Sequence, residues 1–184
     1  PVMLSGERKE TFLKEFDWET FRQHLDVARS QEKDKKGTTT LVDPDSLESP
    51  SEPMMVLYIE DFNTRGLIGA ETNIETFQSP NEFPGPNCFL GLCRNVGDNQ
   101  KGATIGGGTN GFGKGVLWKA SSIRTVLFHS VLSDPYKNED SGQSIHSRFY
   151  GDAQLPSYFL DPDIYSGAGH IGSRELEDGS IASI

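Results

Sequence analysis

Glycine is concentrated in one segment of this 184-residue chain, residues 97–115, GDNQKGATIGGGTNGFGKG, with eight glycines in 19 positions. Glycine permits positive φ and close backbone approach, so successive N–H groups can point into one concavity and hold an anion. A helix that begins near Lys114 would add the positive end of its dipole, and Lys114 a full charge. An exposed loop is the alternative. Because the segment leads directly into an apolar helix and then a strand, Gly106 to Gly115 predicts phosphate binding.

A P-loop is the first nucleotide-binding design to consider. Gly108, Gly113 and Lys114 nearly spell G-x-x-x-x-G-K-[ST], but position 115 is glycine, so the hydroxyl that would ligate magnesium is missing. A P-loop also follows a hydrophobic strand, and GDNQKGATIGG cannot be one. The pattern therefore disfavours a P-loop.

Hydrophobic periodicity predicts a short series of helices and strands. Phe21, Leu25 and Ala28 share one face of a helix from Asp17 to about Arg29, with Asp17 as its cap. Residues 31–53 are rich in Ser, Thr, Pro and charge, which predicts a surface loop or a partly disordered insertion. The other predicted elements are a buried strand at Met54–Ile59, a helix at Cys88–Val96, a helix at Val116–Ser122, a buried strand at Thr125–Leu132, a polar loop at 133–143 and a strand at Ser144–Tyr150.

Two motifs together resemble the GHKL superfamily, the ATP-binding domains of gyrase B, the ninety-kilodalton heat-shock chaperones, histidine kinases and MutL. The family's D-x-G-x-G after a strand corresponds to Asp61 through Leu67, DFNTRGL. Its G-x-x-G-x-G loop corresponds to Gly108 through Gly113, GTNGFG, followed by a helix and a strand in the family's order. The resemblance covers roughly residues 54–132. It extends to a branch of uncharacterised bacterial proteins that share E-D-F-N-T-x-G-L.

The resemblance implies roles for individual residues. Asp61 would accept a hydrogen bond from the adenine amino group, and Gly66 would let the backbone pass close to the base. The remaining cofactor-binding candidates, which would line the same pocket or wrap and neutralise the phosphates, are Asn63, Asn95, Lys101, Gly108, Gly111, Phe112, Gly113 and Lys114. ATP and Mg²⁺ are the implied cofactors.

Two departures from the family pattern qualify these roles. Asn63 stands where the family has glycine, and Gly66 comes one residue late; asparagine tolerates left-handed geometry. The family's helix with Glu and Asn, which supplies the general base and the magnesium ligand, has no counterpart before Asp61, since Asn63 is the first asparagine. We therefore assign no catalytic residue and no metal ligand, and expect a chain truncated at its N-terminus.

Composition restricts the class of protein further. A net charge of −10 argues against nucleic-acid binding, and no apolar run is long enough to span a membrane. Cys88 and Cys93 are too few for a disulfide framework, which favours free thiols and a cytoplasmic location. The four histidines are dispersed and are interpreted as structural, and Trp18 and Trp118 as core or interface residues.

These patterns predict an α+β protein, a two-layer α/β sandwich of the Bergerat type with helices on one face of a mixed sheet. Residues 1–184 would form one partial ATP-binding domain, with a 31–53 insertion, a 54–132 core and a loop-rich 133–184 part. The predicted function is ATP binding, with hydrolysis or an ATP-driven switch in the full-length protein. The alternative is a non-hydrolysing nucleotide- or protein-binding module; a histidine kinase is disfavoured. Another domain or subunit, a homodimer included, is the expected partner.

Overall fold

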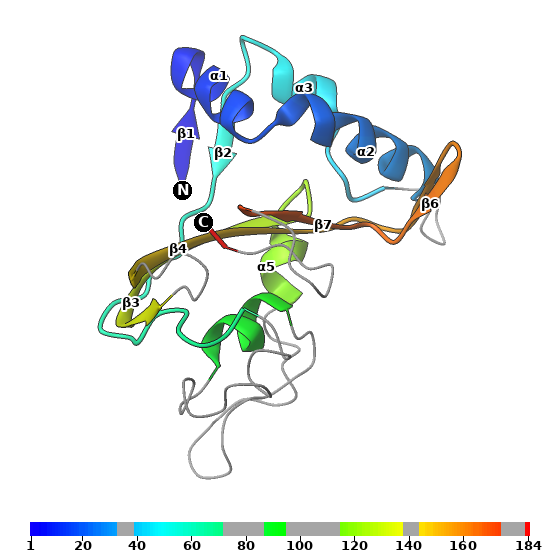
Figure 1. Cartoon of the computed structure of the whole chain (residues 1–184). Coiled ribbons are helices and arrows are strands. Elements are labelled where there is room, and N and C mark those ends of the chain that lie inside the picture. Colours follow the sequence, from blue (N-terminus) through cyan, green and yellow to red (C-terminus); the bar gives the residue numbers. More distant parts are fainter. Residues whose placement is uncertain (33–38, 72–86, 95–114, 138–143, 174–182) are drawn as a thin grey trace. The chain divides into compact units, whose positions relative to one another are not determined.

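Helices and short antiparallel strands together make this chain an α+β protein (Figure 1). The computed structural model describes residues 1–32, 39–71, 87–94, 115–137, 144–173 and 183–184. The chain divides into two compact units, each assembled from separate stretches of sequence. Unit 1 comprises Pro1–Phe62, Ser122–Arg124 and Gln154–Ala168, and unit 2 comprises Asn63–Ser121, Thr125–Ala153 and Gly169–Ile184. The Bergerat sandwich and the single ATP-binding domain stay predictions.

The described residues of unit 1 form three helices and two small strand pairs. The helices are α1 (Gly6–Glu15), α2 (Trp18–Gln31) and α3 (Pro44–Glu48), and the strands are β1 (Val2–Leu4), β2 (Met54–Val56), β5 (Tyr158–Leu160) and β6 (Asp163–Tyr165). Strands β1 and β2 pair antiparallel, as do β5 and β6. The β5–β6 hairpin packs on α2, where the Tyr158 hydroxyl lies 2.6 Å from Nδ1 of His24.

Helix α2 confirms the predicted helix after Asp17. Leu25 and Ala28 are fully buried, as the helical spacing indicated. Asp17 immediately precedes the helix, but its side chain caps no backbone N–H, and its backbone is left-handed with φ of 54°. The prediction of a side-chain cap was therefore wrong.

The predicted loop at 31–53 contains a helix, so that prediction was wrong for Pro44–Glu48. Asp43 caps α3 by accepting a hydrogen bond from the backbone N–H of Asp45 at 3.1 Å. Proline suits the first helical position because it has no N–H to satisfy there. Residues 33–38 of this segment lie outside the described part of the chain.

The apolar run Met54–Ile59 is not a buried strand. Only Met54–Val56 forms a strand, and only Met54 is buried. Leu57, Tyr58 and Ile59 expose 58%, 65% and 71% of their surface. A continuous apolar run is ambiguous in a single sequence, and in the described part of the chain the run extends beyond β1, the strand with which β2 pairs.

Unit 2 contains a three-stranded sheet in the order β3-β4-β7, formed by Thr125–Lys137, Ser144–Gln154 and Ala168–Ile171. The predicted strands at 125–132 and 144–150 are confirmed and are longer than predicted. Residues 133–137 continue β3, so the predicted loop is wrong there; residues 138–143 are not described. The pairing of β3 with β4 shifts register between Val131 and Tyr136.

Along β3, buried and exposed apolar side chains alternate. On β3, Phe128 and Leu132 are buried, whereas Leu127 and Val131 expose 37% and 70% of their surface. The prediction of a wholly buried strand was therefore wrong, because antiparallel strands alternate between two faces. No clear sequence pattern predicted strand β7 or the β5–β6 hairpin.

One aromatic cluster forms the core of unit 2. Helix α5 (Gly115–Ala120) and the short π-helical segment η1 (Leu90–Arg94) contribute side chains to this cluster. Both lie where the sequence predicted a helix. Its buried members are Phe89, Leu90, Cys93, Trp118, Phe128 and Tyr150. We call this set the Tyr150 cluster. Of the described helices, none is both long enough and apolar enough to cross a membrane.

Candidate functional site

The first predicted nucleotide motif, residues 61–67, begins in an exposed segment that belongs to no helix or strand. Asp61 is exposed and follows the irregular segment after β2. Asn63 adopts the left-handed conformation that its residue type tolerates, with φ of 61°. Gly66 also has a positive φ, 73°. The turn geometry expected of Asn63 and Gly66 is thus present.

Gly66 is pressed against strand β3. A Cβ added to it would lie 2.2 Å from the carbonyl oxygen of Val131, so no side chain fits. The neighbouring backbone is fixed to the same strand, because the Leu67 N–H donates to Ser130 Oγ at 2.8 Å and the Ser133 N–H donates to Arg65 O at 3.0 Å. In this structure, the close approach that requires glycine is made to β3.

Seven predicted residues lie outside the described part of the chain: Asn95, Lys101, Gly108, Gly111, Phe112, Gly113 and Lys114. The residues that flank them are described. Before them, Cys93 is buried in the Tyr150 cluster, and after them Trp118 is buried in the same cluster. The Trp118 indole N–H also donates to the carbonyl oxygen of Asp152 at 3.1 Å. Both flanks of residues 95–114 are therefore fixed in one core.

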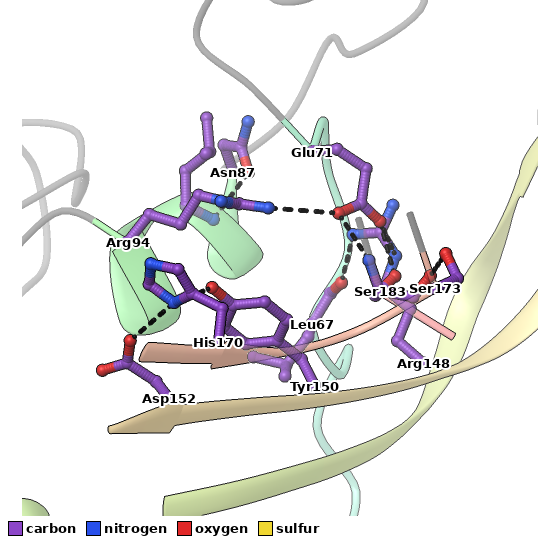
Figure 2. Close-up of polar contacts among 11 residues, drawn as sticks. Leu67, Glu71, Asn87, Arg94, Arg148, Tyr150, Asp152, His170, Ser173 and Ser183 are labelled. Atoms are coloured by element: carbon purple, nitrogen blue, oxygen red, sulfur yellow. Dashed lines mark hydrogen bonds and ion pairs between the residues drawn. The ribbon is translucent and has the colours of Figure 1, made fainter. Parts of the chain in front are cut away.

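A buried carboxylate, Glu71, is the centre of a polar network beside that cluster (Figure 2). Ser183 donates to it twice, from Oγ at 2.5 Å and from the backbone N–H at 3.2 Å. Arg148 Nε lies 3.4 Å from one carboxylate oxygen, and Arg94 Nη2 lies 3.8 Å from the other. Arg148 also donates to the carbonyl oxygen of Leu67 at 2.9 Å, which links the network to the turn at Gly66.

Three polar side chains meet at the other side of the Tyr150 ring (Figure 2). His170 Nδ1 lies 2.8 Å from the Tyr150 hydroxyl and 3.0 Å from Asp152 Oδ1. Asp152 is buried, whereas the His170 side chain is 33% exposed. An Asp152 that accepts from Nδ1–H would leave Nε2 of His170 as the unprotonated nitrogen of the neutral ring.

Burial controls the electrostatics of the cluster. Burial raises the pKa of the Tyr150 hydroxyl, and the nearby Arg94 guanidinium only partly offsets this. Burial likewise raises the pKa of the Cys93 thiol to about 12, with a smaller contribution from Asp152. Cys88 and Cys93 are both free, as predicted, and the pKa of the half-buried Cys88 thiol is also raised by burial.

Cys93 should react very slowly with a thiol-specific reagent. At pH 8 the raised pKa leaves a thiolate fraction about a thousandfold below that of an exposed thiol. Since the folded-state pKa is the higher one, burial of the neutral thiol stabilises the fold fully below about pH 9, and the stabilisation is lost as the pH rises towards about 12. In a Cys88→Ser variant, labelling should be slow in buffer and fast in urea. Equal rates in the two solvents would contradict the burial of Cys93.

Sequence reasoning did not find this network as a site. Arg148, Tyr150 and Asp152 alternate along β4 and share one face of the sheet with their cross-strand partners Ser130, Phe128 and Val126 of β3. That period of two is a readable signal for one strand face. The partners Glu71 and Ser183 carry no such signal, because they are 112 residues apart.

The histidines and the acidic residues form no metal site in the described ranges, where no three His, Cys, Asp or Glu side chains come together. His24 and His170 bond to tyrosines, and His129 and His146 are exposed. Trp18 and Trp118 are both buried, as expected for core residues. Comparison with known proteins found no matching family model, no matching curated protein and no matching solved structure.

Proposed function

We propose that this chain binds ATP, with Asp61 accepting a hydrogen bond from the adenine amino group and the glycine-rich stretch Gly106–Gly115 wrapping the phosphates. The domain would be a two-layer sandwich of the Bergerat type. Hydrolysis would need a general base and a magnesium ligand, which the resemblance assigns to a helix carrying Glu and Asn. ATP would then act as a switch for contact with another domain or subunit, a homodimer included.

One structural observation supports this proposal: the Gly66 turn of the first motif and the segments that flank the second motif are held within the same compact unit. The Gly66 turn is fixed on β3 by the bonds of Arg65 and Leu67. The segments on both sides of residues 95–114 end in the Tyr150 cluster, which packs on the same face of β3 and β4.

The donor set of the described residues suits the nucleotide better than the metal. Asn63 is exposed and has a left-handed backbone, so its polar side chain is open to a ligand, whereas Gly66 packs against β3. For Mg²⁺, the described residues offer no cluster of three His, Cys, Asp or Glu side chains. Magnesium is usually bound through one or two carboxylates together with substrate phosphates and water, so a Mg²⁺ bound with the nucleotide would take most of its ligands from the phosphates and water.

A module that binds a protein partner is the second candidate, and one observation favours it. Leu57, Tyr58, Ile59 and Phe62 are consecutive or nearly so and expose between 58% and 75% of their surface. Contiguous exposed apolar side chains often mark an interaction surface. On this reading the chain would serve as a non-hydrolysing module, with or without a bound nucleotide.

Calorimetric titration with ATP and ADP in the presence of magnesium tests ATP binding. Asp61→Asn should weaken binding of both nucleotides about tenfold to a hundredfold, because it replaces the charged acceptor of the adenine amino group. Glu60→Gln, a neutralised exposed carboxylate one residue earlier, is the matched control and should bind like the wild type.

Two outcomes separate the candidates. Unchanged binding by Asp61→Asn would overturn the adenine assignment alone. No binding of ATP by the wild type would overturn the nucleotide proposal and leave the protein-binding module as the better account.

A further inference from the structure

The imidazole of His170 lies where strand β7 adjoins strand β4, beside Tyr150 and Asp152 (Figure 2). Both polar contacts of the ring use one nitrogen, because Nδ1 is 2.8 Å from the Tyr150 hydroxyl and 3.0 Å from Asp152 Oδ1. Among the described residues, no hydrogen bond or ion pair involves Nε2. The side chain is 33% exposed, so solvent and small molecules reach the ring.

The His170 ring is held in one orientation by its neighbours. It stacks on the Tyr150 ring, with 5.9 Å between the two centroids and 24° between the two planes. Asp152 is buried, and its backbone carbonyl accepts a hydrogen bond from the Trp118 indole N–H at 3.1 Å. His170, Tyr150 and Asp152 all belong to unit 2, so the arrangement lies within one compact unit.

The Asp152 carboxylate determines which nitrogen of the neutral His170 ring carries the proton. An ionised carboxylate can only accept a hydrogen bond, so its contact with Nδ1 favours the tautomer that is protonated at that nitrogen. Nε2 then carries an unshared electron pair and can accept a proton from another molecule. The carboxylate also lies next to the ring in which the positive charge of an imidazolium would develop.

We propose that His170 is a general base that activates water for the hydrolysis of an uncharged ester, with Asp152 as its positioning residue. Nε2 takes a proton from the water while the water oxygen attacks the carbonyl carbon of the ester. The imidazolium returns this proton to the leaving oxygen, so the products are a carboxylic acid and an alcohol, and the histidine is regenerated.

The charge of Asp152 selects the class of substrate. Its carboxylate lies 3.0 Å from the ring and repels an anionic reacting group, whereas an uncharged ester meets no such repulsion. The site uses none of the residues assigned to the nucleotide, so the inference does not depend on ATP binding.

Nitrogen-15 NMR of the histidine rings in the full chain tests the tautomer. At about pH 8, where an imidazole is neutral, His170 should show a protonated Nδ1 and an unprotonated Nε2. His170→Gln identifies its signals among those of the four histidines. Asp152→Asn should increase the population protonated at Nε2, because an amide can donate a hydrogen bond to Nδ1 as well as accept one.

Hydrolysis of p-nitrophenyl acetate by the full chain, without nucleotide, tests the reaction. His170→Gln should lower the rate above that of buffer about tenfold to a hundredfold, and Asp152→Asn should lower it as well. His146→Gln, which removes an exposed histidine from β4, is the matched control and should keep the wild-type rate. The wild-type rate should fall in heavy water because a proton moves during the attack, a dependence that a purely structural role of His170 would not produce.

Three results would each overturn the inference: a wild-type His170 protonated at Nε2, a wild-type rate equal to that of buffer, or equal rates for His170→Gln and His146→Gln. The tautomer is measured on the wild type, so it decides the question even if a variant fails to fold. None of these results bears on ATP binding, which the calorimetric titration measures separately.

Discussion

Replacing Gly66 by alanine should lower the free energy of unfolding by about 2–5 kcal/mol. Two costs combine at this position. Its φ of 73° is unfavourable for a residue with a Cβ, and the added Cβ would lie 2.2 Å from the Val131 carbonyl oxygen. That oxygen is backbone and is held in strand β3, so rotation of a side chain cannot relieve the clash. Urea denaturation of the variant and the wild type measures the difference.

Two other glycines are controls for the separate costs. Gly6 has a positive φ of 52° and no atom within 4 Å of an added Cβ, so Gly6→Ala should show only backbone strain, about 1–2 kcal/mol. Gly115 begins α5, and an added Cβ there meets open space, so its replacement should be neutral or slightly stabilising. If Gly66→Ala lowers the free energy of unfolding by no more than Gly6→Ala does, the close approach of Gly66 to β3 is contradicted.

Removal of the Glu71 carboxylate should cost about 3–5 kcal/mol of folding free energy. Glu71→Ala would remove the carboxylate that forms an ion pair with Arg148, whose side chain is fully buried, and would remove the acceptor of the Ser183 hydroxyl. The cost arises mainly from the buried charge that remains, which cannot regain its hydration. Thermal and urea denaturation monitored by tryptophan fluorescence would report it, because Trp118 is buried in the adjacent cluster.

The ion pair between Arg22 and Asp45 is the matched control. Asp45 lies on the surface, with a side chain 79% exposed. Water and salt screen such a pair, so Asp45→Ala should cost at most about 1 kcal/mol. A loss from Glu71→Ala as small as that from Asp45→Ala would mean that the Glu71 network is solvated and not part of the core.

Local sequence patterns predicted the elements that have a clear period. Helix α2 followed from the spacing of Leu25 and Ala28, and strands β3 and β4 from their apolar or alternating residues. The end of β3 was missed because residues 133–137, SDPYK, are mostly polar. Pro135 lies between Val131 and Tyr136, where the register with β4 shifts, and a strand tolerates proline at such an irregularity.

The candidate site was predictable only where it depends on local backbone geometry. Asn63 and Gly66 could be assigned to a turn because their residue types favour positive φ, and both adopt it. The environment of Arg148 could not be predicted, because its partners Leu67 and Glu71 are brought to it by tertiary folding. The Met54–Ile59 run was misassigned for a similar reason, since burial depends on which segments pack against it.

The division of the chain into interleaved units restricts how the protein can be dissected. Unit 1 includes Ser122–Arg124 and Gln154–Ala168 from the second half of the sequence. The residues that follow each of these two stretches belong to unit 2. No fragment produced by cutting at one peptide bond contains all of either unit and none of the other. Fragments that end near residue 62 would lack the β5–β6 hairpin that covers α2. Expression of an isolated half should therefore yield aggregating material, and a protease that cleaves one internal site should leave both halves associated.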